Sequence, residues 1–282
     1  MVEATFLGDD EIRRRLSTLP NSWFSVNALF HRATRVSRVR TYLAVIDLER
    51  NFDPRPDGLT RRYLTTGFSR LRVVQQFAQY AADISEELPS KLRNDRTLHF
   101  MWRLQLSVYG QLWECLGVQR LIKSISEIAA GSCYNPSVFL DQDPRNSFHN
   151  WESIKSTCKS ASSDLVTTID SLYYNRIRNA IAHSEFYIDY PWLFLGDPLR
   201  EAQREPANKK GPNAKRQGDL QLSTWEMVYK ASYSFFICVS AMRRKIESEL
   251  LERQPVLIEL DEFNGPFILQ RDERGHWVMA KR

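Results

Sequence analysis

Cysteine is scarce in this chain, and its spacing excludes the common metal and disulfide scaffolds. The 282 residues include four cysteines, which lie far apart and form no C-x-x-C pair. The five histidines are equally scattered, and no His/Asp/Glu cluster has the spacing of a metal site. We therefore expect free thiols and no bound metal.

Signals for membranes, secretion and nucleotide binding are also missing. No apolar run approaches the length that crosses a bilayer. The first stretch, MVEATFLGDDEIRRR, has acids where a signal peptide needs a basic start and an apolar segment. The motifs G-x-x-x-x-G-K-[ST], G-x-G-x-x-G and G-x-S-x-G are absent. We expect a cytoplasmic protein without a membrane partner and without a cofactor.

Lysine is absent from the first 80 residues, which carry 13 arginines and 8 acidic residues. The resulting charge of that stretch equals the net charge of the whole chain, +5. Arginine presents a planar fork that matches phosphate, and lysine does not. The pairs Arg35/Arg38 and Arg61/Arg62 are therefore candidates for part of a phosphate-facing surface. The alternative, which we favour from the charge pattern alone, is a solvated helix face.

Hydrophobic periodicity predicts a mainly α protein, a helical bundle. Apolar residues recur at spacings of three and four through several long stretches. The third stretch is apolar on nearly all sides, which is typical of a buried helix. The predicted helices cover residues 22–49, 60–88, 98–130, 149–185, with a possible break near Ser160, and 223–253.

Two regions depart from the helical pattern. The end of the chain holds three short β-prone segments, VLIELDEF, PFILQ and HWVMAK, which predict a small hairpin or three-stranded meander. Residues 200–217 are polar, rich in Pro, Gly and Asn, and without periodicity. They predict a long mobile loop, and residues 131–146 predict a shorter one.

One segment of the fourth predicted helix, RNAIAH at residues 178–183, combines an arginine, an amide and an imidazole. A helical wheel, at about 100° per residue, separates these groups from the apolar side chains. The core face gathers Val166, Ile169, Tyr173, Ile177, Ala180 and Ile181, and the opposite face gathers Asn175, Arg178, Asn179, Ala182 and His183.

These polar side chains suit the cleavage of RNA without a metal. A histidine such as His183 transfers protons near neutral pH, and Arg178 can neutralise charge that develops on phosphorus. Asn179 can hold the imidazole in one orientation. RNA supplies its own nucleophile, the 2′-hydroxyl. The alternative is a helix C-terminus, where Arg and His complement the dipole and bond to the last carbonyls.

The stretch IRNAIAHSEF resembles the signature of the HEPN superfamily, small α-helical domains of many toxins, phage-defence proteins and CRISPR-associated ribonucleases. That signature is an Arg, a following polar residue, and a His four to six residues beyond the Arg. Arg178, Asn179 and His183 match it in order and spacing. The resemblance covers roughly residues 96–253 and, outside the motif, is one of pattern.

The resemblance implies a helical bundle of HEPN type, preceded by extra N-terminal helices at 1–95 and followed by a small β appendage at 254–282. It implies a metal-independent endoribonuclease, acting as a toxin or anti-phage defence effector, with Arg178 and His183 as the catalytic pair and Asn179 as support. It further implies a homodimer in which two motifs face each other across a cleft. An antitoxin or another defence-system protein would be a further partner.

Two other functions stay open from the sequence. Some members of the superfamily keep the fold only to bind RNA, nucleotides or partner proteins, so a non-catalytic module is the main alternative. The other is a helical scaffold whose basic N-terminal face binds nucleic acid and whose motif is only a helix end.

Two further residues are candidates for supporting roles. Glu114 lies in the most apolar predicted helix, where a carboxylate needs a partner or water, and Arg178 could be that partner. The favoured alternative is that Ser107, Gln111 and Glu114 form the one wet stripe of this helix. Tyr187 could stack on a base or pack against the bundle, and we favour packing.

RNA would also need cations outside the motif. The loop at 200–217 carries six Lys and Arg and almost no apolar residue. We expect it to add to RNA affinity without contributing to folding. The predicted RNA-binding residues are Arg35, Arg38, Lys209, Lys210, Lys215 and Arg216.

Overall fold

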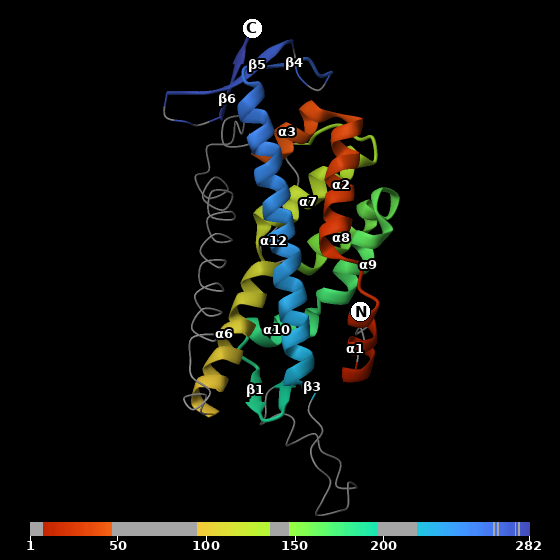
Figure 1. Ribbon diagram of the computed structural model, residues 1–282, viewed down its shortest axis with the longest axis vertical. Helices are drawn as coiled ribbons and strands as arrows, with labels where there is room; N and C mark the ends of the chain where they lie inside the picture. Colours follow the sequence, from red (N-terminus) through yellow and green to blue (C-terminus); the bar gives the residue numbers. More distant parts are fainter. Residues whose placement is uncertain are drawn as a thin grey trace, which may run out of the picture. The chain divides into compact units, whose positions relative to one another are not determined.

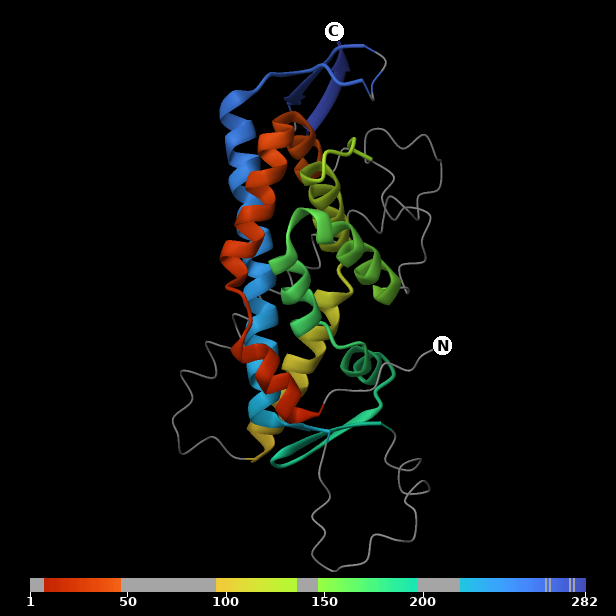
Figure 2. The ribbon, with the colours of Figure 1, turned by 90° about the vertical axis from the view of Figure 1, so that its right-hand side faces the viewer.

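The computed structural model describes residues 8–46, 95–135, 147–196 and 219–282, apart from 262, 264, 274 and 276. This part of the chain is mainly helical and carries two small antiparallel sheets (Figures 1 and 2). The mainly α prediction is therefore confirmed. No helix within these ranges is long and apolar enough to span a bilayer.

Some predictions fall outside the described residues. They are the helix at 60–88, the loop at 200–217 and most of the loop at 131–146. The phosphate-surface candidates Arg61 and Arg62 lie there too, as do the candidate RNA-binding residues Lys209, Lys210, Lys215 and Arg216.

The described residues form two compact units, and each unit draws on several separate stretches of the chain. The predicted division into 1–95, 96–253 and 254–282 stays a prediction. The first unit contains α1 (Asp9–Ser17), α6 (Asp95–Trp113), α10 (Asn175–Ala182), β1 (Phe186–Asp189), β2 (Trp192–Leu195), β3 (Leu220–Gln221) and the first part of α12 (Leu222–Arg253).

The second unit is built around α7, which packs against three other helices, α2, α3 and α8. The remainder of α12 belongs to it, and a three-stranded sheet of order β4-β5-β6 follows that helix (Figure 1). This sheet confirms the predicted C-terminal meander. The unit contains α2 (Ser22–Val36), α3 (Arg38–Ile46), α7 (Leu116–Ala129), α8 (Ser147–Ala161), most of α9 (Ser163–Leu172), β4 (Val256–Ile258), β5 (Phe267–Arg271) and β6 (Trp277–Lys281).

The predicted helix at 22–49 is wrong in its length, because the chain breaks at Ser37 between α2 and α3. Ser37 has an extended backbone, and its hydroxyl accepts a hydrogen bond from the Arg40 N–H at 3.2 Å. This is the geometry of a helix N-cap, which serine favours. A capping serine inside an apolar pattern therefore starts a new helix.

The predicted helix at 98–130 is also two helices, α6 and α7. The break falls at Glu114 and Cys115, and Cys115 is the extended N-cap of α7 without a capping side-chain bond. Glu114 thus lies in a turn and is half-buried, whereas the sequence predicts it inside a helix. Neither Glu nor Cys is a favoured helix-capping residue, so the amino-acid sequence gives little indication of this break.

The predicted helix at 149–185 is three helices. The first break, at Ser162, lies close to the possible one near Ser160, and the Ser162 hydroxyl accepts the Leu165 N–H at 3.3 Å. The second break, at Tyr173 and Tyr174, is not predicted. It separates α10 from α9, and the motif therefore lies on a short helix of its own.

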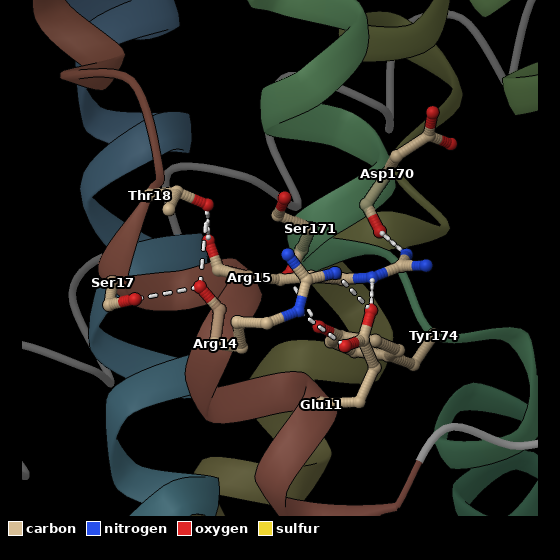
Figure 3. Close-up of polar contacts among 8 residues, drawn as sticks. All are labelled: Glu11, Arg14, Arg15, Ser17, Thr18, Asp170, Ser171 and Tyr174. Carbon is tan, nitrogen blue, oxygen red and sulfur yellow. Dashed lines mark hydrogen bonds and ion pairs between the residues drawn. The ribbon is translucent and has the colours of Figure 1, made fainter.

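Periodicity predicts no helix before residue 22, yet α1 forms there in the first unit. Its first turn is acidic and its last turn is basic, an arrangement that complements the helix dipole. Glu11 accepts hydrogen bonds from Arg14 at 2.6 and 2.7 Å and from Arg15 at 2.9 Å. Figure 3 shows these two guanidinium groups around the Glu11 carboxylate, with Arg15 also reaching the Asp170 carbonyl oxygen at 3.4 Å. Charge patterning, rather than apolar periodicity, is the sequence signal for α1.

The ion pairs of Glu11 with Arg14 and Arg15 should make the stability of the fold depend on pH in the acidic range. Hydrogen bonds from Arg14 and then Arg15 lower the pKa of Glu11 from 4.5 to about 2. Because the folded-state pKa is depressed, ionised Glu11 stabilises the fold above about pH 4.5, and this contribution is lost as the pH falls towards 2. Glu11→Gln should lower the melting temperature at pH 7 and leave it nearly unchanged at pH 2, as measured by circular dichroism. Glu252→Gln, an exposed carboxylate on α12, is the control. An equal loss at both pH values would contradict this role.

Candidate functional site

The motif side chains lie on α10 and just beyond it. The Nη1 group of Arg178 donates a hydrogen bond to Oδ1 of Asn179 at 2.9 Å, and both residues are half-buried. His183 is exposed. Ile177 and Ala180 are buried on the other side of the helix, as the wheel predicts. The structure therefore pairs the arginine with the amide and leaves the imidazole open to solvent.

His183 is the C-cap residue of α10, and the helix ends in a Schellman motif. The Glu185 N–H bonds to the Ala180 carbonyl at 2.8 Å, and the Ser184 N–H bonds to the Ile181 carbonyl at 3.1 Å. Ser184 takes a φ of 56°, the left-handed region that glycine usually fills at this position. These bonds fix the main chain around His183, so the position of its Cα and the direction of its Cα–Cβ bond are fixed as well.

A single buried hydroxyl fixes the start of α10. Tyr109 on α6 donates to the Leu172 carbonyl at the end of α9 and accepts the N–H of Tyr174, both at 2.9 Å. Tyr174 is the N-cap of α10 and its own side chain makes no capping bond. Tyr109 thus satisfies the last carbonyl of α9 and the N–H of the N-cap of α10, and so ties the start of α10 to the end of α9.

The next residue on α6, Gly110, lets the two helices approach closely. A side-chain carbon at this position would lie 3.2 Å from Cγ2 of Ile181, which is tighter than ordinary contact. Ile181 stands between Asn179 and His183 in the chain. Consecutive residues of α6 therefore support the two ends of the motif helix.

A polar clamp joins α10 to the adjoining sheet. Arg176 donates to the Leu195 carbonyl at 3.0 Å and pairs with Asp219 at 2.8 Å. The other Asp219 oxygen accepts the Leu195 N–H at 2.7 Å. Both main-chain groups of Leu195 at the end of β2 are thereby satisfied, which holds β2 beside the motif helix.

Tyr187 lies on β1, in the antiparallel sheet of order β1-β2-β3 that directly follows the motif. Its ring stacks on Phe194 of β2, with centroids 4.4 Å apart and an interplanar angle of 5°. The two residues are direct cross-strand partners. One face of the Tyr187 ring is therefore used inside the sheet.

The remaining predicted site residues that the structure describes lie in the second unit. Glu114 belongs to that unit, and so do Arg35 on α2 and Arg38 on α3. Arg35 and Arg38 are exposed. The motif and these residues are thus built on different compact units.

Sequence reasoning missed the residues that position the motif. Tyr109, Arg176 and Asp219 each hold an end of α10 or of the adjoining strand. Tyr109 lies 70 positions before the motif residue Asn179 in the chain, and nothing in its local sequence marks its hydroxyl. Arg176 lies two residues before Arg178, and its place in the same helix is the one sequence signal that could have identified it as a positioning residue.

The arrangement offers two kinds of chemistry on one helix end. The Arg178 guanidinium can bind phosphate oxygens, and its bond to Asn179 limits its rotation. The exposed His183 imidazole can exchange protons with a ligand and with water.

Comparison with known proteins found no match. No family model matches this chain, no curated protein matches it, and no solved structure matches it. Functional inference therefore depends on the residues of the chain itself.

Proposed function

We propose that this protein is a metal-independent endoribonuclease of HEPN type. The observation that carries the proposal is the Arg178–Asn179 hydrogen bond on α10, one turn before the exposed His183. A fixed cation on this short helix and a proton-transfer group at its C-cap are two of the groups that phosphodiester cleavage in RNA uses.

The proposed reaction uses the 2′-hydroxyl of the substrate. The 2′-oxygen loses its proton to a base and attacks the adjacent phosphorus, and the bond from phosphorus to the 5′-oxygen breaks. An acid returns a proton to the leaving 5′-oxygen. Arg178 binds the phosphate oxygens on which negative charge increases, and His183 transfers a proton. The products are a 2′,3′-cyclic phosphate and a 5′-hydroxyl end.

One copy of the chain supplies one His183 and one Arg178, whereas the reaction needs both a base and an acid. A two-fold contact would bring a second motif to the same substrate. We therefore propose that the active form is a homodimer, and that it serves as a toxin or anti-phage defence effector that cuts RNA. An antitoxin or another defence-system protein would then be its regulatory partner.

Cleavage should continue in EDTA, because the proposed reaction uses only side chains and the substrate's own hydroxyl. Labelled single-stranded RNA, incubated with protein and either EDTA or magnesium, should give the same fragments at similar rates. End-group analysis should find cyclic phosphate and 5′-hydroxyl ends. DNA of the same sequence and RNA with methylated 2′-oxygens are the controls and should stay intact. Cleavage that needs added metal would contradict the mechanism.

The second candidate function is a non-catalytic module that binds RNA or a partner protein. His183 is the C-cap of α10, a position at which histidine also serves as a favourable helix end. A folded protein that binds RNA but cuts none under any of these conditions would favour this function.

A further inference from the structure

The exposed side of α2 carries positive charge without any negative charge. From residue 20 to residue 46 the chain has four arginines, one histidine and no acidic residue. Arg35 and Arg38 are exposed and pair with no carboxylate among the described residues. Their charge is therefore available to an external anion.

Arg35 shares one face of α2 with an exposed aromatic ring, and Arg38 is the first residue of α3, two positions after α2 ends. Phe24, Ala28, His31 and Arg35 follow each other at spacings of four, three and four residues, and all four are exposed. Such spacing aligns side chains in one row along a helix. The row from Phe24 to Arg35 is about 16 Å long at the α-helical rise. It matches about five nucleotides of a stacked strand at ~3.4 Å each.

Two large aromatic side chains stand at the start of this row. Trp23 is 44% exposed and Phe24 is 69% exposed. Two neighbouring exposed rings bordered by polar side chains are typical of an interaction surface rather than of an ordinary solvated helix. Every nucleobase has an aromatic face on which a ring can stack. Proteins that bind single-stranded nucleic acid therefore commonly combine aromatic rings with arginines.

The row belongs to a helix that is held by other residues. The Asn21 side chain caps α2 by accepting the Trp23 N–H at 2.9 Å. Arg32 donates to the Ala161 carbonyl at the end of α8 at 2.9 Å, while Leu29 and Phe30 are buried. The exposed row can therefore be changed without removing the contacts that fold this part of the chain.

We propose that Trp23, Phe24, His31, Arg35 and Arg38 form a binding surface for single-stranded RNA, separate from the α10 motif. The choice of RNA as the anion rests on the proposed function. Bases stack on the two aromatic rings, and the phosphates that follow lie against the arginines. The surface would hold a strand while another part of it is cut.

A single strand fits this surface better than a duplex or a protein partner does. In a duplex the bases are stacked on each other, so the aromatic rings would have no base face to contact. An acidic protein would satisfy the arginines but gives no reason for two neighbouring exposed rings. A membrane with anionic lipids would suit both groups, and the experiment includes it.

The test is fluorescence anisotropy with a labelled 2′-O-methyl RNA strand, which binds but cannot react by the proposed route. The same strand in a duplex and vesicles of phosphatidylcholine with phosphatidylserine are the other two probes. The double variant Trp23→Ala/Phe24→Ala should bind the single strand about tenfold more weakly or worse. Arg35→Gln and Arg38→Gln should each reduce the slope of log affinity against log salt by about 0.7.

Two matched variants serve as controls. Phe100→Ala removes an exposed ring on α6, and Arg244→Gln removes an exposed arginine on α12. Both should leave affinity and salt dependence as in the wild type. Equal weakening by the controls, unchanged affinity in the α2 variants, or equal binding of the duplex would overturn the proposal. Loss of vesicle binding with unchanged RNA binding in the same variants would also overturn it.

The experiment separates this inference from the proposed function. If the wild type cuts no RNA but binds the strand through α2, the proposed ribonuclease function is contradicted and the proposed binding surface is supported. If the wild type cuts RNA and the α2 variants bind and cleave RNA as well as it does, only the proposed binding surface is contradicted.

Discussion

His183→Ala should cleave RNA at least about a hundredfold more slowly than the wild type, the low end for loss of a general acid or base. The side chain is exposed at the end of α10, and the Schellman bonds that end this helix are main-chain bonds. The variant should therefore fold normally. Initial rates on labelled RNA, with circular dichroism as the check on folding, measure both expectations.

Arg178→Ala should cause a comparable loss, because it removes positive charge from the phosphate oxygens in the transition state. Arg178→Lys is the more informative change. It keeps the charge but loses the planar fork that bonds Asn179 and could grip two oxygens together. We expect it to recover only part of the activity, and full recovery would mean that charge alone is needed.

The matched control is His149→Ala, which removes another exposed histidine, on α8. It should cleave RNA at the wild-type rate. Full activity in His183→Ala would remove the proposed mechanism, and so would an equal loss in His149→Ala. If the wild type cuts no RNA, the non-catalytic module becomes the better description.

Sequence periodicity predicts the buried faces of this protein better than its helix ends. Within α10 the pattern places Ile177 and Ala180 in the core and His183 outside it, as the structure has them. The pattern nevertheless treats residues 149–185 as one helix with a single possible break. Apolar residues continue through every break, because the chain on both sides still packs against a core, so periodicity alone cannot show where a helix stops.

The breaks depend on partners that are distant in the sequence. Ser37 and Ser162 cap the helices that follow them, and a serine in such a pattern is a readable signal. Tyr173 and Tyr174 are not capping residues, and their break is satisfied by the hydroxyl of Tyr109 on another helix. The motif can be predicted from the sequence because its three residues lie within six positions of one another. The residues that hold its helix in place cannot, because they contact it only in the folded protein.

The strands that follow the motif illustrate the same limit. Residues 186–195 form a hairpin, which the sequence analysis does not predict, with Tyr187 stacked on Phe194 across the pair. The connecting turn lacks the Asn-Gly or Asp-Gly signal of a two-residue hairpin. The third strand, β3, follows only after the long segment that ends before Asp219.

Tyr109→Phe should be among the most destabilising single-atom changes in the first unit. It removes the hydroxyl that bonds both the Leu172 carbonyl and the Tyr174 N–H, and all three residues are buried. The loss of a partner for a buried polar group costs about 1–3 kcal/mol, and here two groups lose theirs. We expect a lower free energy of unfolding in urea and faster amide exchange at Tyr174, where α10 begins.

The matched control is Tyr229→Phe on α12, a half-buried tyrosine whose hydroxyl makes no hydrogen bond with the described residues. Its ring also packs against Trp225, as the ring of Tyr109 does, so the two variants differ mainly in the bonds that are lost. Tyr229→Phe should change the unfolding free energy little. If both variants behave alike, the Tyr109 hydroxyl does not hold the start of α10. If only Tyr109→Phe is destabilised and its RNA cleavage falls more than its folded fraction does, the direction of α10 governs the placement of Arg178 and His183.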